Sequence, residues 1–389
     1  MSRRILVLTS GTGSGHDMRA RAFAEWIRHF HGNRIEVRIE QVIENASLLG
    51  RFGVWVYNTI HRRAPFLHNL YFFIVEIFIS SHQGSVSFGG RYYRRLLKTF
   101  QPDLILSVHD STNRGYFEDA RRILGKDIRC VTYCGEFSGG FGYSRNWVNP
   151  TADHFIARTE EARQYAIRLG IPPHRSSVFQ RLLPPAAFQA GFSHADREAL
   201  RRQLGLDPDR FTLFLATGGY GANHHLAFLR HLLPLAERLQ VIVICGRDKA
   251  LHESVLRWSQ CHPSLRTYVE GYSTRVSDFL HISDAILTRG GANTTMEALH
   301  AECPLLYNSL GGLMPQEQCT VRYVLNHGAA RRLRKPRDLP AILRSWASFG
   351  PDYAEVRAHL RGLQRDEDPR RLIQSVLGER FFPETTPIS

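Results

Sequence analysis

The sequence contains little cysteine and no long apolar run. Its six cysteines form neither a disulfide framework nor a zinc-site spacing, which is typical of a reducing cytosol. No stretch is long and apolar enough for a transmembrane helix. The apolar run behind Arg3 and Arg4 covers only residues 5–8, too short for a signal peptide. We therefore expect a cytoplasmic protein without a membrane-spanning segment.

Motifs that would identify other functions are missing as well. The stretch SGTGSGHD spaces Gly11, Gly13 and Gly15 as G-x-G-x-G, and His16 stands where a dinucleotide fingerprint needs its third glycine. This argues against an NAD-dependent dehydrogenase. Aromatic residues are not interleaved with basic residues as in RNA-binding modules. No strand ends in a D-x-D pair, so the sequence predicts no metal-held diphosphate.

Basic residues are in excess, mostly in the first half of the chain. There are 50 Lys and Arg against 36 Asp and Glu, a formal net charge of +14. Residues 1–190 hold 25 of the basic and 15 of the acidic residues. Such a half attracts nucleic acid, anionic lipid or a phosphorylated substrate. Without a nucleic-acid module, we favour an anionic membrane surface as the partner.

Short apolar runs alternate with helical stretches, which predicts parallel sheets with crossover helices in two successive domains. We assign residues 1–190 and 197–360 to these domains, and expect a helix within 361–389 to cross back to the first. The predicted fold class is α/β with two doubly wound domains. Its strands cover 5–9, 35–40, 102–108, 127–134, 153–158, 211–217, 241–246, 266–272, 284–289 and 303–308, with a linker near 184–196.

Residues 46–98 interrupt the first domain with an insert rich in large apolar and aromatic residues. Two interpretations remain open. In one, apolar side chains of the insert enter the acyl boundary of a membrane while arginines meet phosphate headgroups. In the other, the insert forms buried helices in which Glu76 is paired or exposed. The candidate membrane or acceptor contacts are Arg62, Arg63, Phe66, Phe72 and Phe73.

Two glycine turns each follow a predicted strand and precede a predicted helix. The first is residues 11–15, before a helix over about 18–30, and the second is GGAN at 290–293, before a helix near Thr294. Backbone N–H groups at such helix starts favour a phosphate or diphosphate. Glu297 has two interpretations: it forms a capping box with Thr294, or it accepts hydrogen bonds from the two hydroxyl groups of a ribose.

Six blocks of the sequence, in order, resemble the GT-B glycosyltransferases that use UDP-sugars, the group that contains the peptidoglycan enzyme MurG. The similarity is closest to monogalactosyldiacylglycerol synthases and processive diacylglycerol glucosyltransferases, and it covers most of residues 5–330. The blocks are SGTGSGHDMRARAFAEWI, WVYNTIHRRAPFLHNLYFF, ARTEEARQYAIRLGIPPHRSSVF, VIVICGRDKAL, EGYSTRVSDFLHISDAILTRGGANTTMEAL and MPQEQCTVRYVLNHGAA. The resemblance implies a GT-B fold, in which two Rossmann-like domains face each other across a cleft.

The resemblance also implies roles for single residues of a donor site. Glu297 would bind the ribose hydroxyls, and Gln316 and Glu317 would contact the donor sugar. The residues implied near uracil are Tyr272, Ser273 and Val276, and those near the diphosphate are Gly13, Ser14, Gly15, Gly218, Gly219, Gly221, Gly290, Gly291, Asn293 and Thr294.

Sugar transfer needs a group that takes the proton of the acceptor hydroxyl as it attacks the anomeric carbon. His16, at the end of the first strand, is the first candidate for this base, or for a contact to acceptor and diphosphate. Glu136 in YCGEFSGG is the second candidate and Asp110 the third. Helix-start amides can stabilise the diphosphate, so we expect metal-independent transfer with no cofactor besides the UDP-sugar substrate. The resemblance implies inversion at the anomeric carbon.

Four positions bear on the limits of this resemblance. Pro315 replaces a glycine before the Gln-Glu pair and Thr320 replaces an asparagine, which leaves glucose, galactose and N-acetylglucosamine open as the donor sugar. Asp17 adds negative charge beside the proposed base. Arg289 matches a basic residue of the family and either faces phosphate or caps its strand in solvent.

Together these inferences predict a peripheral enzyme of the inner face of the cell membrane. It would move a hexose from a UDP-sugar to a lipid hydroxyl, with diacylglycerol as the acceptor. The alternatives are a glycosyltransferase for a natural-product or polyprenyl-linked acceptor, a UDP-sugar epimerase on the same fold, and a non-catalytic UDP-sugar-binding subunit.

Overall fold

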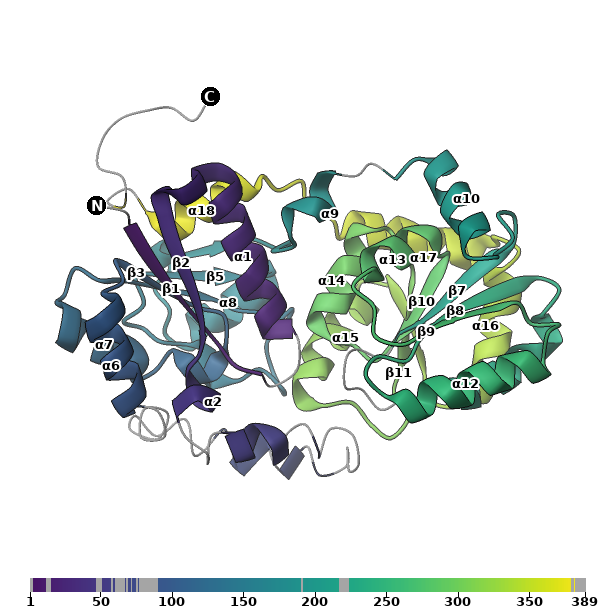
Figure 1. The fold of residues 1–389 in the computed structure, drawn as a ribbon, viewed down its shortest axis with the longest axis horizontal. Helices are drawn as coiled ribbons and strands as arrows, with labels where there is room; N and C mark the ends of the chain where they lie inside the picture. Colours follow the sequence, from purple (N-terminus) through teal and green to yellow (C-terminus); the bar gives the residue numbers. More distant parts are fainter. Residues whose placement is uncertain are drawn as a thin grey trace. The chain divides into compact units, whose positions relative to one another are not determined.

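The chain forms two compact units, each built around its own sheet (Figure 1). The structure, a computed structural model, describes residues 3–11, 15–46, 51–56, 59, 67, 69–70, 72–74, 76, 90–189, 192–216, 224–378 and 381. The first unit consists of Met1–Asn58, Asn69–Phe188 and Asp366–Ser389, and the second of Thr59–His68 and Gln189–Arg365. The last passage of the chain between the units therefore comes after Arg365.

Six parallel strands form the sheet of the first unit, in the order β2-β1-β3-β4-β5-β6. They are β1 (Arg3–Thr9), β2 (Ile35–Gln41), β3 (Leu104–Ser107), β4 (Arg129–Tyr133), β5 (His154–Ala157) and β6 (Ser176–Val178). In β1, Val7 pairs in register with Ile39 on one side and Leu106 on the other. The central strands are unbroken apolar runs because helices cover both faces of a parallel sheet.

The helices of the first unit pack on opposite faces of this sheet, as Figure 1 shows. They are α1 (Gly15–His31), α2 (Val42–Ala46), α6 (Gly90–Phe100), α7 (Tyr116–Leu124), α8 (Glu160–Arg168), α9 (Pro185–Gln189) and α18 (Pro369–Leu377). Successive side chains of a strand point to opposite faces. Accordingly, Ile5 and Val7 of β1 join the core formed with α1 and α18, whereas Leu6 and Leu8 join the core formed with α6 and α7.

The second unit has the same layout, with parallel strands in the order β12-β11-β10-β7-β8-β9. The strands are β7 (Phe211–Ala216), β8 (Leu239–Ile244), β9 (Thr267–Glu270), β10 (Ala285–Thr288), β11 (Leu305–Asn308) and β12 (Ala330–Leu333). The helices are α10 (His194–Gln203), α11 (His225–Leu232), α12 (Lys249–Cys261), α13 (Val276–Ile282), α14 (Ala292–His300), α15 (Pro315–Asn326), α16 (Leu339–Trp346) and α17 (Pro351–Gly362). Buried side chains of β7, β8, α11, α16 and α17 share one core.

The predicted class, two doubly wound α/β sheets, is confirmed. Every predicted strand is present, but the edge strands β6 and β12 were not predicted, because their sequences SSV and ARRL are not apolar runs. Helix α1 begins at Gly15 rather than near residue 18, and the region expected to be a linker contains α9 and the start of α10. Within the described part of the chain, no helix has the length and apolarity needed to cross a bilayer.

Candidate functional site

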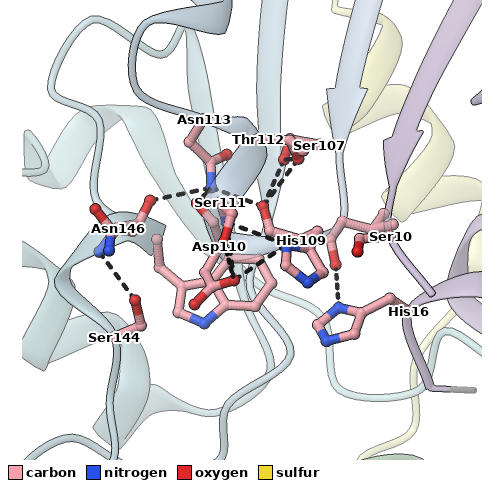
Figure 2. Close-up of polar contacts among 12 residues, drawn as sticks. Ser10, His16, Ser107, His109, Asp110, Ser111, Thr112, Asn113, Ser144 and Asn146 are labelled. Carbon is pink, nitrogen blue, oxygen red and sulfur yellow. Dashed lines mark hydrogen bonds and ion pairs between the residues drawn. The ribbon is translucent and has the colours of Figure 1, made fainter. Parts of the chain in front are cut away.

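His16 lies in the first turn of α1, at the carboxyl end of β1. Its Nδ1 is 2.9 Å from the carbonyl oxygen of Val108, just after β3 (Figure 2). Nη2 of Arg19 lies 2.5 Å from the same Nδ1 and 3.3 Å from the same oxygen. Burial lowers the pKa of His16 well below its ordinary value, and repulsion from His109 and Arg19 adds to the effect. The imidazole is therefore neutral at pH 7.

The two neutral tautomers of His16 have different chemistry. With the proton on Nδ1, His16 donates to the carbonyl oxygen of Val108, and the Nε2 lone pair can accept a proton from a ligand. With the proton on Nε2, Nδ1 accepts a hydrogen bond from Arg19, and His16 becomes a donor to a ligand. Because Arg19 reaches both Nδ1 and the Val108 oxygen, its position determines which tautomer is favoured.

Glu136 follows β4 and is 9% exposed. Burial raises the pKa of its carboxyl to about 7, against the opposing effect of the nearby Arg19 cation. Nε1 of Trp147 donates a hydrogen bond to Oε1 at 3.3 Å. An ideal Cβ at the neighbouring Gly135 would overlap the Arg19 guanidinium, so glycine is required there for Arg19 to reach the site. A carboxyl with a pKa near neutrality suits general acid–base work.

Asp110 begins a short 3-10 turn after β3 and lies next to His109 (Figure 2). Its Oδ1 is 3.1 Å from Nδ1 of His109, whose ring lies 4.2 Å from that of His16, centroid to centroid. The side-chain amide of Asn113 donates to the carbonyl oxygen of His109 at 3.0 Å and holds this turn in place. Neither His109 nor Asn113 was identified from the sequence, although both lie just after a predicted strand, in SVHDSTN.

The start of the first glycine turn is held by Glu44 of α2, which no sequence motif marks. Its Oε1 accepts hydrogen bonds from Oγ of Ser10 at 2.8 Å and from the amide of Gly11 at 2.5 Å. Asp17, expected as added negative charge beside His16, accepts from Oγ1 of Thr9 and from Nε2 of Gln41. It thus joins the ends of β1 and β2 to α1. Gly15 is the first residue of α1, whereas Gly13 and Ser14 lie outside the described residues.

The second glycine turn connects β10 to α14. Gly290 has φ +123°, and a Cβ there would lie 2.5 Å from Cγ2 of Val321. Gly291 is the N-cap, and a Cβ at this position would meet nothing within 4 Å. Asn293 and Thr294 lie in the first turn of α14. The positive end of the α14 dipole therefore lies at the carboxyl edge of the second sheet, where an anion is favoured.

The capping-box interpretation of Glu297 is wrong. Helix α14 begins at Ala292, two residues before the predicted start, and no side chain caps it. Thr294 is the third helical residue and Glu297 lies in the second turn. The left-handed conformation of Gly290 turns the chain into the helix earlier than the sequence pattern suggested.

Arg289 does not cap its strand in solvent, because it is only 3% exposed. Its Nη2 lies 3.3 Å from the Glu317 carboxylate and donates to the carbonyl oxygen of Gly312 at 2.6 Å. The same carboxylate accepts from the amide of Met314 at 2.9 Å. Glu317, expected at the donor sugar, therefore ties the loop after β11 to the start of α15.

Two of the positions that depart from the family pattern, Pro315 and Thr320, lie on α15. Pro315 is its first residue, where proline is well tolerated. Gln316 follows in the same turn and is half-buried. Thr320 is fully buried, and its Oγ1 has no hydrogen-bond partner in the part of the chain that the structure describes.

The residues predicted near uracil share one turn between β9 and the start of α13. Tyr272 is 57% exposed, and Cζ of Arg247 lies 4.8 Å from its ring centroid. Oγ of Ser273 accepts from the amide of Arg275 at 3.1 Å, and Val276 begins α13. This turn lies at the same carboxyl edge of the second sheet as the Gly290 turn. The second unit's other predicted phosphate loop, Gly218, Gly219 and Gly221, lies outside the described residues.

The described part of the insert exposes aromatic side chains and has one anchored carboxylate. The rings of Phe72 and Phe73 lie 6.4 and 6.2 Å from that of Phe141, and Phe73 is 51% exposed. Glu76 is paired: it accepts hydrogen bonds from Oγ of Ser144 at 2.8 Å and from the following amide at 2.6 Å. Arg62, Arg63 and Phe66 lie outside the described residues.

Comparison with known sequences gives one domain match and a set of distant relatives. Residues 212–330 match the glycosyltransferase family 28 C-terminal domain. A probable monogalactosyldiacylglycerol synthase from chloroplasts of Nicotiana tabacum is 25% identical over 379 residues, 91% of this chain and 66% of that protein. The chain thus spans just under two thirds of that relative's length. A processive diacylglycerol beta-glucosyltransferase of Bacillus licheniformis is 21% identical over 381 residues, 97% of this chain and 95% of the relative.

Solved structures with similar folds cover nearly the whole chain. MurG of Acinetobacter baumannii has a TM-score of 0.60 at 14% identity, with 96% of this chain and 99% of MurG covered. A putative UDP-N-acetylglucosamine 2-epimerase of Listeria monocytogenes has a TM-score of 0.61 at 10% identity, with 98% and 97% covered. HepE of Anabaena in complex with UDP has a TM-score of 0.54 at 13% identity, with 93% and 94% covered. At these identities the likeness is one of fold alone.

Proposed function

From the match of residues 212–330 to the glycosyltransferase family 28 C-terminal domain and from the likeness of the chain to GT-B glycosyltransferases, we propose that it transfers a hexose from a UDP-sugar to the free hydroxyl of diacylglycerol. The two named relatives differ in the sugar, galactose or glucose, but both names specify a glycosylated diacylglycerol. UDP is the ligand of the similar Anabaena structure.

The observation that carries the chemistry is the group formed by the half-buried His16 and the buried Arg19 and Glu136. At neutral pH His16 is uncharged and the pKa of Glu136 is about 7, so each can take up a proton. The acceptor oxygen forms its bond to the anomeric carbon as the bond from that carbon to UDP breaks. Its proton passes to Nε2 of His16, which requires the tautomer that donates Nδ1–H to Val108. A single displacement of this kind inverts the anomeric carbon.

On the donor side, the α14 start would receive the diphosphate and stabilise the charge that UDP carries away. Glu297, which does not cap its helix, would accept hydrogen bonds from the ribose hydroxyls. Gln316 would contact the sugar, and Glu317 would position the loop before it through Arg289. We expect this arrangement to work without a metal ion, so that a chelator such as EDTA leaves the transfer rate unchanged.

Exposed aromatic side chains of the insert would bring the enzyme to its lipid substrate. Phe52 and Trp55 are each 57% exposed, with ring centroids 5.7 Å apart. Together with Phe73, and with the excess of basic residues in the first half, they suit an anionic membrane surface. Salt above physiological strength should then release the protein from phosphatidylglycerol vesicles. Binding that ignores both salt and vesicle charge would contradict this electrostatic part.

The test is UDP release by the purified full chain with UDP-glucose, UDP-galactose or UDP-N-acetylglucosamine, with and without diacylglycerol in anionic vesicles. We expect release with one donor, only when diacylglycerol is present, and a new glycolipid on chromatography. Release that needs a different acceptor would support the natural-product or polyprenyl alternative. Conversion of the UDP-sugar without any acceptor would instead support an epimerase.

The same assay tests the proposed base. We expect His16→Ala to abolish transfer while UDP binding, measured by calorimetry, persists. Substantial remaining activity in His16→Ala, together with its loss in Glu136→Gln, would move the base role to Glu136.

A further inference from the structure

A groove of about 1040 Å³ opens at the amino edge of the first sheet, the edge opposite to the one that carries His16. It is bounded by the first residues of β4 and β5, by the end of α1 and by α18. None of the residues assigned above to transfer lines it. Its volume is that of a site for a small organic ligand.

The groove is strongly basic. Lys126, Arg175, Arg370 and Arg371 line it, all are exposed, and no described carboxylate lies within ion-pair distance of any of them. Two carboxylates also line the groove. That of Asp153 is already bound by Arg121 at 3.0 Å and by the amide of Cys130 at 2.7 Å, and that of Asp127 is exposed. A concave wall of unpaired cations focuses a positive potential and attracts anions.

One face of the groove also offers an aromatic surface. The Arg370 guanidinium lies 5.8 Å from the ring centroid of Phe30, which lines the groove at the end of α1. Stacking of this kind gives a flat cationic and apolar wall next to the other positive charges. A ligand that combines phosphate groups with an apolar or planar part would match both features.

A soluble ligand suits this position better than a lipid headgroup. The proposed membrane contacts follow the carboxyl ends of strands: the insert comes after β2 and α2, and Phe141 comes after β4. The groove lies at the amino ends, and a strand of five to seven residues separates the two edges by roughly 16–23 Å. A flat membrane in contact with one edge would not reach the other.

We propose that this groove binds a soluble phosphorylated ligand of nucleotide size, at a site separate from the donor site, and that the ligand joins α18 to the sheet. Arg129 already links them, because its Nε and Nη2 donate to the carbonyl oxygens of Val376 and Ser375 at 2.7 and 2.9 Å. An anion shared by Arg175 of the sheet edge and Arg371 of α18 would add a second link. The ligand would thus stabilise the helix that follows the last crossing between the units.

The proposal is tested by calorimetry on the full chain with saturating UDP present, so that the proposed donor site is occupied. Sodium pyrophosphate and ATP are the soluble probes. The variant is Arg175→Glu/Arg371→Glu, and the matched control is Arg95→Glu, an exposed and unpaired arginine of α6. We expect one further binding site for the probe. Its affinity should be at least about tenfold lower in the double variant and unchanged in the control. Hydrogen exchange should show that the probe protects residues 369–377 in the wild type.

Three results would overturn this inference. The first is that neither probe binds at millimolar concentration, and the second is that the wild type and the double variant bind equally well. The third is that the protein binds only phosphatidic acid vesicles, which would assign the groove to a lipid headgroup. UDP titration and the transfer assay on the same variants keep the outcome separate from the proposed function, because neither should change when the groove alone is altered.

Discussion

Arg19 provides the sharpest test of how the first unit sets the protonation of its candidate base. Its guanidinium is buried and remains charged at neutral pH, although burial lowers its pKa to about 10. It lies against Nδ1 of His16 and lowers the pKa of that imidazole. We predict that Arg19→Gln, which removes the charge but keeps a polar side chain, raises the pKa of His16.

The size of the effect follows from the contact. Two unit charges about 4 Å apart interact by about 4 kcal/mol at an effective dielectric of about 20, which is an upper limit of about three pKa units at 1.36 kcal/mol each. Burial and His109 continue to lower the pKa in the variant. We therefore expect the pKa of His16 to rise, but by less than this limit. The pKa of Glu136 should rise above about 7 at the same time, because it loses the cation that lowers it most.

Two measurements report this shift. A titration of the His16 Cε1–H resonance gives the pKa directly, and the acid limb of the kcat/KM profile should move to higher pH by the same amount. Arg19→Lys is the matched control: it keeps the charge, so the pKa of His16 should stay low. An unchanged pKa in a folded Arg19→Gln protein would refute the reasoning.

The remaining predictions concern stability and donor binding. The folded-state pKa of Glu136 is raised, from 4.5 to about 7, so its stabilising contribution is present at low pH and lost as pH rises through 7. The free energy of unfolding of Glu136→Gln, measured in urea, should therefore increase by about 3 kcal/mol relative to that of the wild type between pH 4 and pH 8. A difference that stays constant over this range would contradict the prediction. Gly290→Ala should cost about 1–3 kcal/mol of unfolding free energy, whereas Gly291→Ala, where a Cβ has space, should change it by less than about 0.5 kcal/mol; equal losses would count against the steric argument. Glu297→Gln should weaken UDP binding at least about tenfold in calorimetry without lowering the melting temperature, and loss of stability with unchanged affinity would indicate a structural role.

The fold was largely predictable because most strands are buried on both faces. In β8, all six residues are buried, and such a run stands out in the sequence. The edge strands β6 and β12 contain Ser and Arg, since a strand at the edge of a sheet needs no continuous apolar run, and they were missed for that reason. Helix starts were less predictable than strands, as α14 shows, because backbone conformation at Gly290 decides where the helix begins.

Candidate bases were predicted from polar side chains that come after the carboxyl end of a strand, as in His16, Glu136 and Asp110. The resemblance to GT-B enzymes supported His16 and Glu136, and their roles stay predictions. Arg19 was not predicted, because on α1 it looks like an ordinary helical residue. It is buried against His16 only because Gly135, far away in the sequence, leaves space for its guanidinium. Contacts of that kind arise from the tertiary fold and produce no recognisable pattern in the local sequence.

The return of the chain to the first unit has a consequence for synthesis on the ribosome. Helix α18 supplies Leu372, Ile373, Val376 and Leu377 to the core built on β1 and α1. These side chains are made only after the whole segment Gln189–Arg365 of the second unit. At about 5–20 residues per second, that segment takes roughly 10–35 s to translate. During this interval the nascent first unit exposes the apolar surface that α18 later covers, so the half of the protein that is made first is completed last.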